Sequence, residues 1–127
     1  MSLQQLSSNK VFGGQHLRYQ HESSALNCSM QFAVYLPPQV ELGKPLPVLY
    51  WLSGLTCTDE NFMQKAEALK AAAALGLIIV APDTSPRGEG VADDPEGAWD
   101  FGLGAGFYIN ATQEPWAQHY RMYDYVV

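Results

Sequence analysis

Apolar and polar residues alternate along two segments near the N-terminus, residues 16–20 and 30–36. A period of two is the pattern of a strand with one buried face, so we expect two half-buried strands here. In the second segment the apolar positions of one phase are Met30, Phe32, Val34 and Leu36. Pro37 and Pro38 end this strand, because proline has no N–H for the ladder and restricts the residue before it.

Two later runs, residues 48–52 and 77–81, are apolar on both faces. Such runs are typical of parallel strands that are covered on both sides, and we expect residues 48–52 to be a central parallel strand. Pro45 and Pro47 precede the first run, and Pro82 closes the second.

A helix is predicted between these two runs. Thr56 and Thr58 precede two acidic residues, a pattern typical of a helix start, because a hydroxyl caps free N–H groups and acids favour the positive helix end. Helical spacing then places on one face Phe62, Ala66, Leu69 and Ala73. Gly76 is placed to end the helix. We therefore expect residues 48–81 to form a βαβ unit with a right-handed crossover.

From Pro82 to Pro115 the chain shows no sustained period, and irregular segments of this length are typical of functional loops. Its aromatic residues favour packing over disorder. Helical spacing returns at the end, in Trp116, Tyr120, Tyr123 and Val127. Only one complete helix is then predicted for strands that need cover on both sides. We expect missing sequence or a partner chain to complete the domain.

Length and charge narrow the class of protein. The 127 residues correspond to about one domain, and 13 acidic against 7 basic residues give a net charge of −6, which argues against nucleic-acid binding. The chain has neither a leader pattern nor 18 consecutive apolar residues, so neither export nor a membrane span is expected. Cys28 and Cys57 lack a paired spacing, which predicts free thiols and a cytoplasmic location.

Metal and cofactor patterns are weak. His16 and His21 are separated by an odd number of positions, so on a strand they point to opposite faces and do not form a ligand pair. Asp93 and Asp94 are expected to form a solvated turn rather than a metal site. The glycine-rich residues 102–106 do not follow a strand or complete the dinucleotide fingerprint, so we expect close packing there. We expect neither a metal nor an organic cofactor.

No nucleophile elbow of the form Gly-X-Ser-X-Gly is present, and no Ser-His-Asp triad can be assembled from these residues. The predicted turn from strand to helix, residues 53–56, lies where open α/β sheets bind ligands. Gly54 allows a sharp turn, after which the N–H of Leu55 points outward as an anion donor. In an acyl-transfer enzyme such a donor stabilises the oxyanion by about 3–4 kcal/mol.

Cys57 lies beside this turn, near the N-terminus of the predicted helix. Helix amides favour a thiolate there, while the alternative is a small packed side chain. The sequence alone leaves both open.

Several segments, in the same order along the chain, resemble the esterase D family, the S-formylglutathione hydrolases. They are residues 50–62, 81–88, 99–108, 115–116 and 120–123. The resemblance implies an α/β-hydrolase fold, of which residues 1–127 are the N-terminal part: two leading strands, then a βαβ unit of a mostly parallel sheet. It also implies that the chain stops before the nucleophile elbow.

The resemblance further implies hydrolysis of S-formylglutathione to glutathione and formate, in formaldehyde detoxification. The reaction uses a serine, an aspartate and a histidine without a cofactor, in a cytoplasmic and often dimeric enzyme. Leu55 is implied as one oxyanion-hole donor, with Gly54 and the non-nucleophilic thiol of Cys57 near the site. Because this chain holds none of the three triad residues, we expect the 127 residues alone to be inactive.

Two alternatives remain open from the sequence. A non-catalytic half-domain would act by pairing its open sheet edge with a partner or with itself. A related carboxylesterase of the same fold would accept a different acyl group, since fold does not fix substrate.

Overall fold

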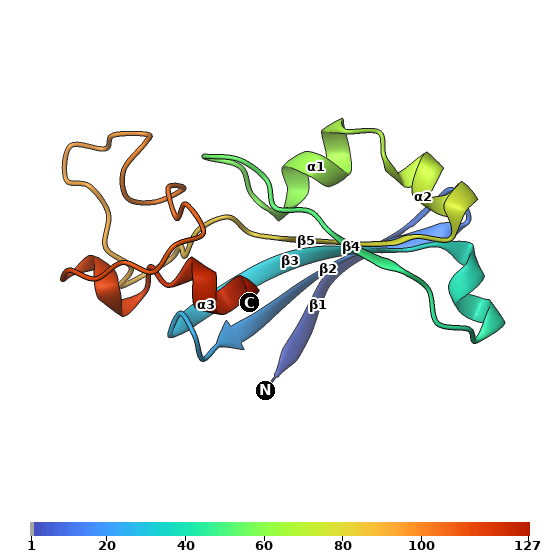
Figure 1. Cartoon of the computed structure of the whole chain (residues 1–127), viewed down its shortest axis with the longest axis horizontal. Helices are drawn as coiled ribbons and strands as arrows, with labels where there is room; N and C mark the ends of the chain where they lie inside the picture. Colours follow the sequence, from blue (N-terminus) through green and yellow to red (C-terminus); the bar gives the residue numbers. More distant parts are fainter. Residues whose placement is uncertain (1) are drawn as a thin grey trace.

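The computed structural model describes residues 2–127. One sheet contains all five strands, in the order β1-β2-β3-β5-β4. The strands are β1 (Leu3–Val11), β2 (Gly14–Ser23), β3 (Cys28–Leu36), β4 (Val48–Tyr50) and β5 (Ile78–Pro82). The helical segments are η1 (Pro38–Leu42), α1 (Asp59–Lys65), α2 (Leu69–Leu75), η2 (Trp116–Gln118) and α3 (Met122–Val126). In Figure 1, α1 and α2 lie on one side of the sheet and α3 on the other.

The sheet is mixed. β4 and β5 pair in parallel, whereas β1–β2, β2–β3 and β3–β5 are antiparallel. The two predicted leading strands correspond to β2 and β3, and the two apolar runs correspond to β4 and β5, joined through α1 and α2. The predicted N-terminal part of an α/β fold is confirmed.

The sequence pattern did not predict β1, whose residues are mostly polar and exposed. It is held by backbone pairing to β2, from Leu3 opposite His21 to Val11 opposite Gly14. Phe12 and Gly13 join the two strands with φ angles of 48° and 78°. Two successive positive φ angles are typical of the tight hairpin turn that matches strand twist. The strand is therefore specified by its turn and its ladder, not by a buried face.

β3 contributes buried residues on both of its faces, although alternation predicted one buried face. Ala33 and Tyr35 are fully buried in the core beneath α1 and α2, with Met63, Leu69, Ala72, Ile79 and Ala81. Met30, from the opposite phase, packs with Leu26 and Met122 under α3. Alternation did not predict the second face because the hydroxyl of Tyr35 makes this residue read as polar, whereas its ring is apolar. Its hydroxyl donates to the Val11 carbonyl at 2.9 Å.

The predicted single helix is two helices. Ala66 ends α1, and Glu67 adopts a left-handed φ of 54°, which breaks the helical ladder before α2 begins. The two helices still turn a common apolar side to the sheet. Gly76 ends α2 with a φ of 69°, as predicted.

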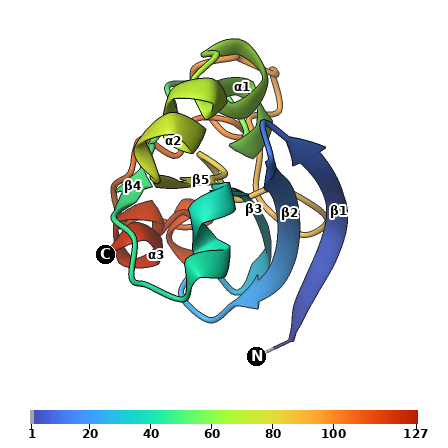
Figure 2. The same cartoon turned by 90° about the vertical axis from the view of Figure 1, so that its right-hand side faces the viewer.

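β4 was predicted to be central, and in this structure it lies at the edge of the sheet. Figure 2 shows β1 at one edge and β4 at the other. Val48, Leu49 and Tyr50 are 45%, 41% and 67% exposed. Among residues 2–127 no strand pairs with the outer side of β4, which accounts for the exposure of a sequence that reads as buried.

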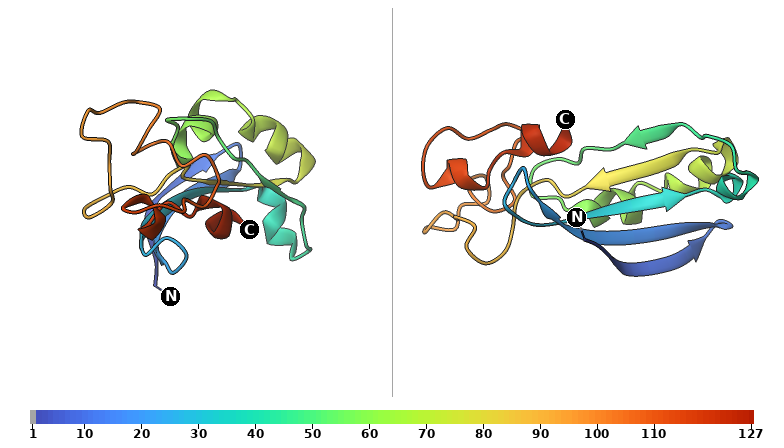
Figure 3. Two further views of the ribbon diagram at one scale, coloured as in Figure 1. Left: turned by 60° about the vertical axis from the view of Figure 1, so that its left-hand side comes forward. Right: turned by 90° about the horizontal axis from the view of Figure 1, so that it is seen from below.

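The segment after β5 has no helix or strand until η2, as predicted. An isolated β-bridge joins Asn110 in this segment to Arg121, the residue before α3. The segment is nevertheless anchored, since residues 81–86 are all buried. Figure 3 shows this segment at the end of the sheet to which the arrows of β4 and β5 point. No helix in the described part of the chain is long and apolar enough to cross a bilayer.

Thr58 caps α1 as the sequence predicts. Its hydroxyl accepts from the Glu60 amide at 3.2 Å, and its own amide donates to Asn61 Oδ1 at 2.7 Å. We expect Thr58→Ala to lower the free energy of unfolding by about 1 kcal/mol, because it leaves helix N–H groups without an acceptor. Urea denaturation measures this. Thr112→Ala, at an exposed position outside any helix, is the control and should change stability by less than about 0.5 kcal/mol.

Candidate active site

A tight turn follows β4 at residues 54–57. The Cys57 amide donates to the Gly54 carbonyl at 3.1 Å, and Thr56 adopts a left-handed φ of 69°. A positive φ at the third residue of a β-turn is the mark of a type II turn, in which glycine or asparagine is usual. In such a turn the carbonyl of the first residue points inward, so the N–H of the second residue, Leu55, points away from the turn.

The Leu55 amide has no protein acceptor among residues 2–127. A cavity of about 240 Å³ adjoins it, lined by residues 53–55 of the turn and by Thr84, Gly104, Phe107 and Tyr108. An oxygen atom that enters this cavity can therefore be met by a backbone donor already in place, and preorganised donors of this kind stabilise developing negative charge. The predicted site residues Gly54 and Leu55 both line this cavity.

Four hydrogen bonds fix the turn from outside. The Thr56 amide donates to the Gly104 carbonyl at 2.9 Å, and the Tyr108 hydroxyl donates to the Ser53 carbonyl at 2.7 Å. The Cys57 carbonyl accepts from both Thr84 Oγ1 and Arg87 Nη2. The loop after β5 therefore holds both ends of the turn after β4.

Arg87 is itself oriented by an ion pair. Its Nε lies 3.0 and 3.2 Å from the two carboxylate oxygens of Asp83, which is buried at the end of β5. Burial raises the pKa of the Asp83 carboxyl, and the Arg87 guanidinium opposes that shift. The pair aims the remaining guanidinium donors at the Cys57 carbonyl.

The glycine run at residues 102–106 is closely packed, as its sequence predicts. A Cβ at Gly106 would lie 2.6 Å from the Thr84 carbonyl oxygen, and one at Gly102 would lie 2.3 Å from Asp93 Oδ1. Gly104 has a φ of 86° and supplies the carbonyl that holds Thr56. These glycines bring the loop against the turn and its support.

Cys57 contributes its backbone to the turn, and its half-buried side chain does not line the cavity. Asp93 and Asp94 accept backbone N–H groups within their own loop, from Asp94, Leu103, Glu96 and Ala98, which agrees with the predicted acidic turn. No group of three metal-binding side chains occurs within the part of the chain that the structure describes.

Two of the three histidines form hydrogen bonds away from this turn. His21 Nε2 lies 2.9 Å from the Tyr125 hydroxyl under α3, and His119 Nδ1 lies 2.8 Å from the Leu26 carbonyl. Across residues 2–127 no histidine is hydrogen-bonded to a serine. The described residues therefore place an unpartnered backbone amide beside a cavity and hold no hydrogen-bonded serine–histidine pair.

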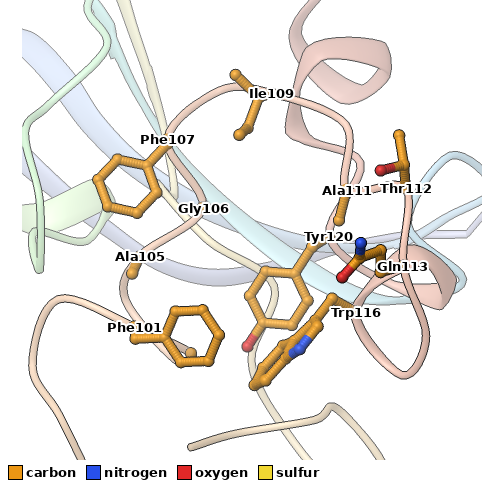
Figure 4. Close-up of a pocket in the computed structure, with 11 residues that line it drawn as sticks. Phe101, Ala105, Gly106, Phe107, Ile109, Ala111, Thr112, Gln113, Trp116 and Tyr120 are labelled. Carbon is orange, nitrogen blue, oxygen red and sulfur yellow. The ribbon is translucent and has the colours of Figure 1, made fainter.

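A second cavity, of about 250 Å³, was not predicted from the sequence (Figure 4). Phe101 and Trp116 meet edge to face at 4.7 Å between ring centres, and Trp116 meets Tyr120 in the same way at 5.4 Å. Phe107 lines both this aromatic cavity and the cavity beside Leu55. The cavity was missed because its residues come from an irregular loop, where no periodic pattern brings them together.

The left-handed Thr56 yields a test of the turn. A β-branched residue at positive φ is strained by about 1–2 kcal/mol, and glycine is not. We expect Thr56→Gly to raise the free energy of unfolding by about 0.5–1 kcal/mol after the entropic cost of glycine. Thr56→Val keeps the branched side chain and should leave stability nearly unchanged. Urea denaturation measures the free energy of unfolding of both variants. A lower value for Thr56→Gly than for the wild type would contradict the described turn.

Known proteins match this chain along nearly all its length. The Esterase family model matches residues 23–126. S-formylglutathione hydrolases of Mus musculus and Bos taurus are each 56% identical over 126 residues, which cover 99% of this chain and 44% of theirs. A solved structure of an S-formylglutathione hydrolase from Agrobacterium tumefaciens superposes with a TM-score of 0.92 at 50% identity, covering 97% of this chain and 44% of that one.

A ferulic acid esterase from Anaeromyces mucronatus, at 24% identity and a TM-score of 0.54, shares the fold. The chain thus spans less than half the length of the relatives that it matches. It belongs to the esterase family, and more than half of its residues are identical to those of mammalian S-formylglutathione hydrolases.

Proposed function

We propose that the protein carrying these residues hydrolyses S-formylglutathione to glutathione and formate. The observation that supports it most is the Leu55 amide, which is unpartnered among residues 2–127, fixed by the turn, and beside a cavity. The names of the relatives at 56% identity supply the substrate. Within this proposal residues 1–127 are the N-terminal part of a single α/β-hydrolase domain. They contribute the oxyanion-hole loop, and the triad comes from residues outside them.

The chemistry would proceed by acyl transfer. A serine, deprotonated by a histidine, attacks the formyl carbon, and the carbonyl oxygen becomes the oxyanion that accepts a hydrogen bond from Leu55 N–H. The carbon–sulfur bond then breaks, and the histidine returns the proton to the glutathione thiolate. Water attacks the formyl-serine through the same histidine and releases formate.

Gly54 and Cys57 have supporting roles in this proposal. Gly54 forms the bend, and the Cys57 amide fixes the peptide that carries the Leu55 N–H. The Cys57 thiol is near the site without acting as the nucleophile. The proposed setting is formaldehyde detoxification in the cytoplasm, by a homodimer.

Replacement of Leu55 by proline isolates the proposed donor. Proline removes one N–H, and the second position of a type II turn accommodates its ring. In the complete protein we expect kcat for S-formylglutathione to fall about 100- to 1000-fold, with KM changed little, since the donor acts mainly on the oxyanion. Leu55→Ala retains the amide and should keep kcat within about fivefold. The polypeptide of residues 1–127 alone should show no turnover.

The wild type and the two variants together show which part of the proposal is wrong if the expected result is not found. If the complete wild-type protein does not cleave S-formylglutathione, the substrate assignment is wrong. If it does and Leu55→Pro is as active as Leu55→Ala, the oxyanion role of Leu55 is wrong.

The aromatic cavity favours a second candidate, a carboxylesterase for a longer apolar acyl group. Glutathione is a charged peptide, whereas four aromatic residues, Phe101, Phe107, Trp116 and Tyr120, are among those that line this cavity. Because Phe107 lines both cavities, we expect its ring to limit an acyl chain that extends from one toward the other.

Selectivity between acyl groups distinguishes the candidates. We expect the complete wild-type protein to prefer formyl over hexanoyl thioesters of glutathione in kcat/KM. Phe107→Ala should raise the hexanoyl to formyl ratio about tenfold, since each accommodated methylene contributes about 1–3 kcal/mol at most. A wild-type preference for the hexanoyl thioester would instead support the carboxylesterase.

A further inference from the structure

Tyr108 reaches across the fold to the start of the oxyanion turn. Its hydroxyl donates to the Ser53 carbonyl at 2.7 Å, between residues 55 positions apart, and its side chain lines the cavity beside Leu55. Ser53 is buried, with 6% of its surface exposed. A buried carbonyl without a donor costs free energy, so this bond determines which way the Ser53–Gly54 peptide faces.

Gly54 alone separates that peptide from the one that carries the Leu55 N–H. Glycine rotates freely about both backbone bonds, and a Cβ at this position would meet no described atom within 4 Å. Packing of neighbouring side chains therefore does not hold Gly54 in place. The direction of the Leu55 amide depends on hydrogen bonds at the two sides of this glycine, from Cys57 N–H to Gly54 O and from Tyr108 to Ser53 O.

The backbone around Tyr108 is built to aim this side chain. Phe107 and Tyr108 both adopt a left-handed φ of 54°. Two successive non-glycine residues in this region are costly and persist only where the surroundings impose them. Gly106 provides the anchor, because it packs so tightly on Thr84 that no side chain fits between them.

The hydroxyl remains a donor over the working range of an enzyme. Burial, with smaller contributions from Asp83 and Cys57, raises the pKa of Tyr108 to about 12. The phenol therefore stays protonated near neutral pH, and the Ser53 carbonyl keeps its partner.

We propose that Tyr108 is a positioning residue for the oxyanion donor: its hydroxyl holds the Ser53 carbonyl and thereby fixes the Leu55 amide toward the cavity. The inference rests on the proposed acyl-transfer function and extends it to a residue in the loop after β5. Tyr108 acts through Ser53 and Gly54, and its hydroxyl makes no proton transfer.

Tyr108→Phe in the complete protein tests the proposal, because it deletes one hydroxyl and keeps the ring. We expect kcat for S-formylglutathione to fall about ten- to hundredfold with KM within about twofold, as for a misplaced transition-state donor. The matched control is Tyr35→Phe. Its hydroxyl also donates to a backbone carbonyl, that of Val11 at 2.9 Å, in the core beneath α1 and α2. It should leave kcat unchanged.

Equal losses of kcat in the two variants would show a general effect of losing a tyrosine bond and overturn the proposal, as would unchanged kcat in Tyr108→Phe. A second measurement does not need activity. In ¹⁵N relaxation dispersion, Tyr108→Phe should add exchange broadening at the Gly54 and Leu55 amides that neither the wild type nor Tyr35→Phe shows.

An inactive wild-type protein would count against the proposed function alone, and the relaxation measurement would then decide the role of Tyr108. Absence of added broadening in Tyr108→Phe would overturn it.

Discussion

The parallel pairing of β4 with β5 is the constraint on which the site depends. Parallel strands end at the same edge of a sheet, and the ladder continues one step beyond β4, where the Trp51 amide donates to the Val80 carbonyl at 2.8 Å. The turn after β4 and the buried segment after β5 are thus brought side by side. The contacts of Thr84 and Arg87 with the turn follow from that register, and a slip of one residue would reverse the faces of the strand that shifts.

Backbone strain is concentrated at this edge. The described residues contain six non-glycine residues with positive φ. Two of them, Phe107 and Tyr108, line the cavity beside Leu55, and a third, Thr56, directly follows Leu55 in the turn. Each is costly alone and is imposed by hydrogen bonds or close packing from its neighbours. Strain of this kind is typical of sites where a donor must be held in place before the substrate arrives. The remaining three lie in connections between strands or helices.

Local sequence signals predicted the elements that depend on local physics. The apolar runs predicted β4 and β5, Thr58 predicted the start of α1, and Gly76 predicted the end of α2. The sequence also located Gly54 and Leu55 at the strand-to-helix turn, because a strand end followed by Ser-Gly and a helix cap is recognisable without a structure. What could not be predicted depends on distant contacts. The partner of Ser53 is a tyrosine 55 residues away in a loop without a pattern, and the edge position of β4 depends on the strands available to pair with it.

The two cores on opposite faces of β3 have a consequence for synthesis on the ribosome. The side of β3 that carries Met30 is closed by Met122, and the Leu26 carbonyl nearby is met by a histidine 93 residues later. At about 5–20 residues per second, the hairpin of β2 and β3 emerges roughly 5–20 s before its cover does. During that interval a nascent chain presents an apolar surface to solvent, which makes this face a natural target for chaperones that bind during translation.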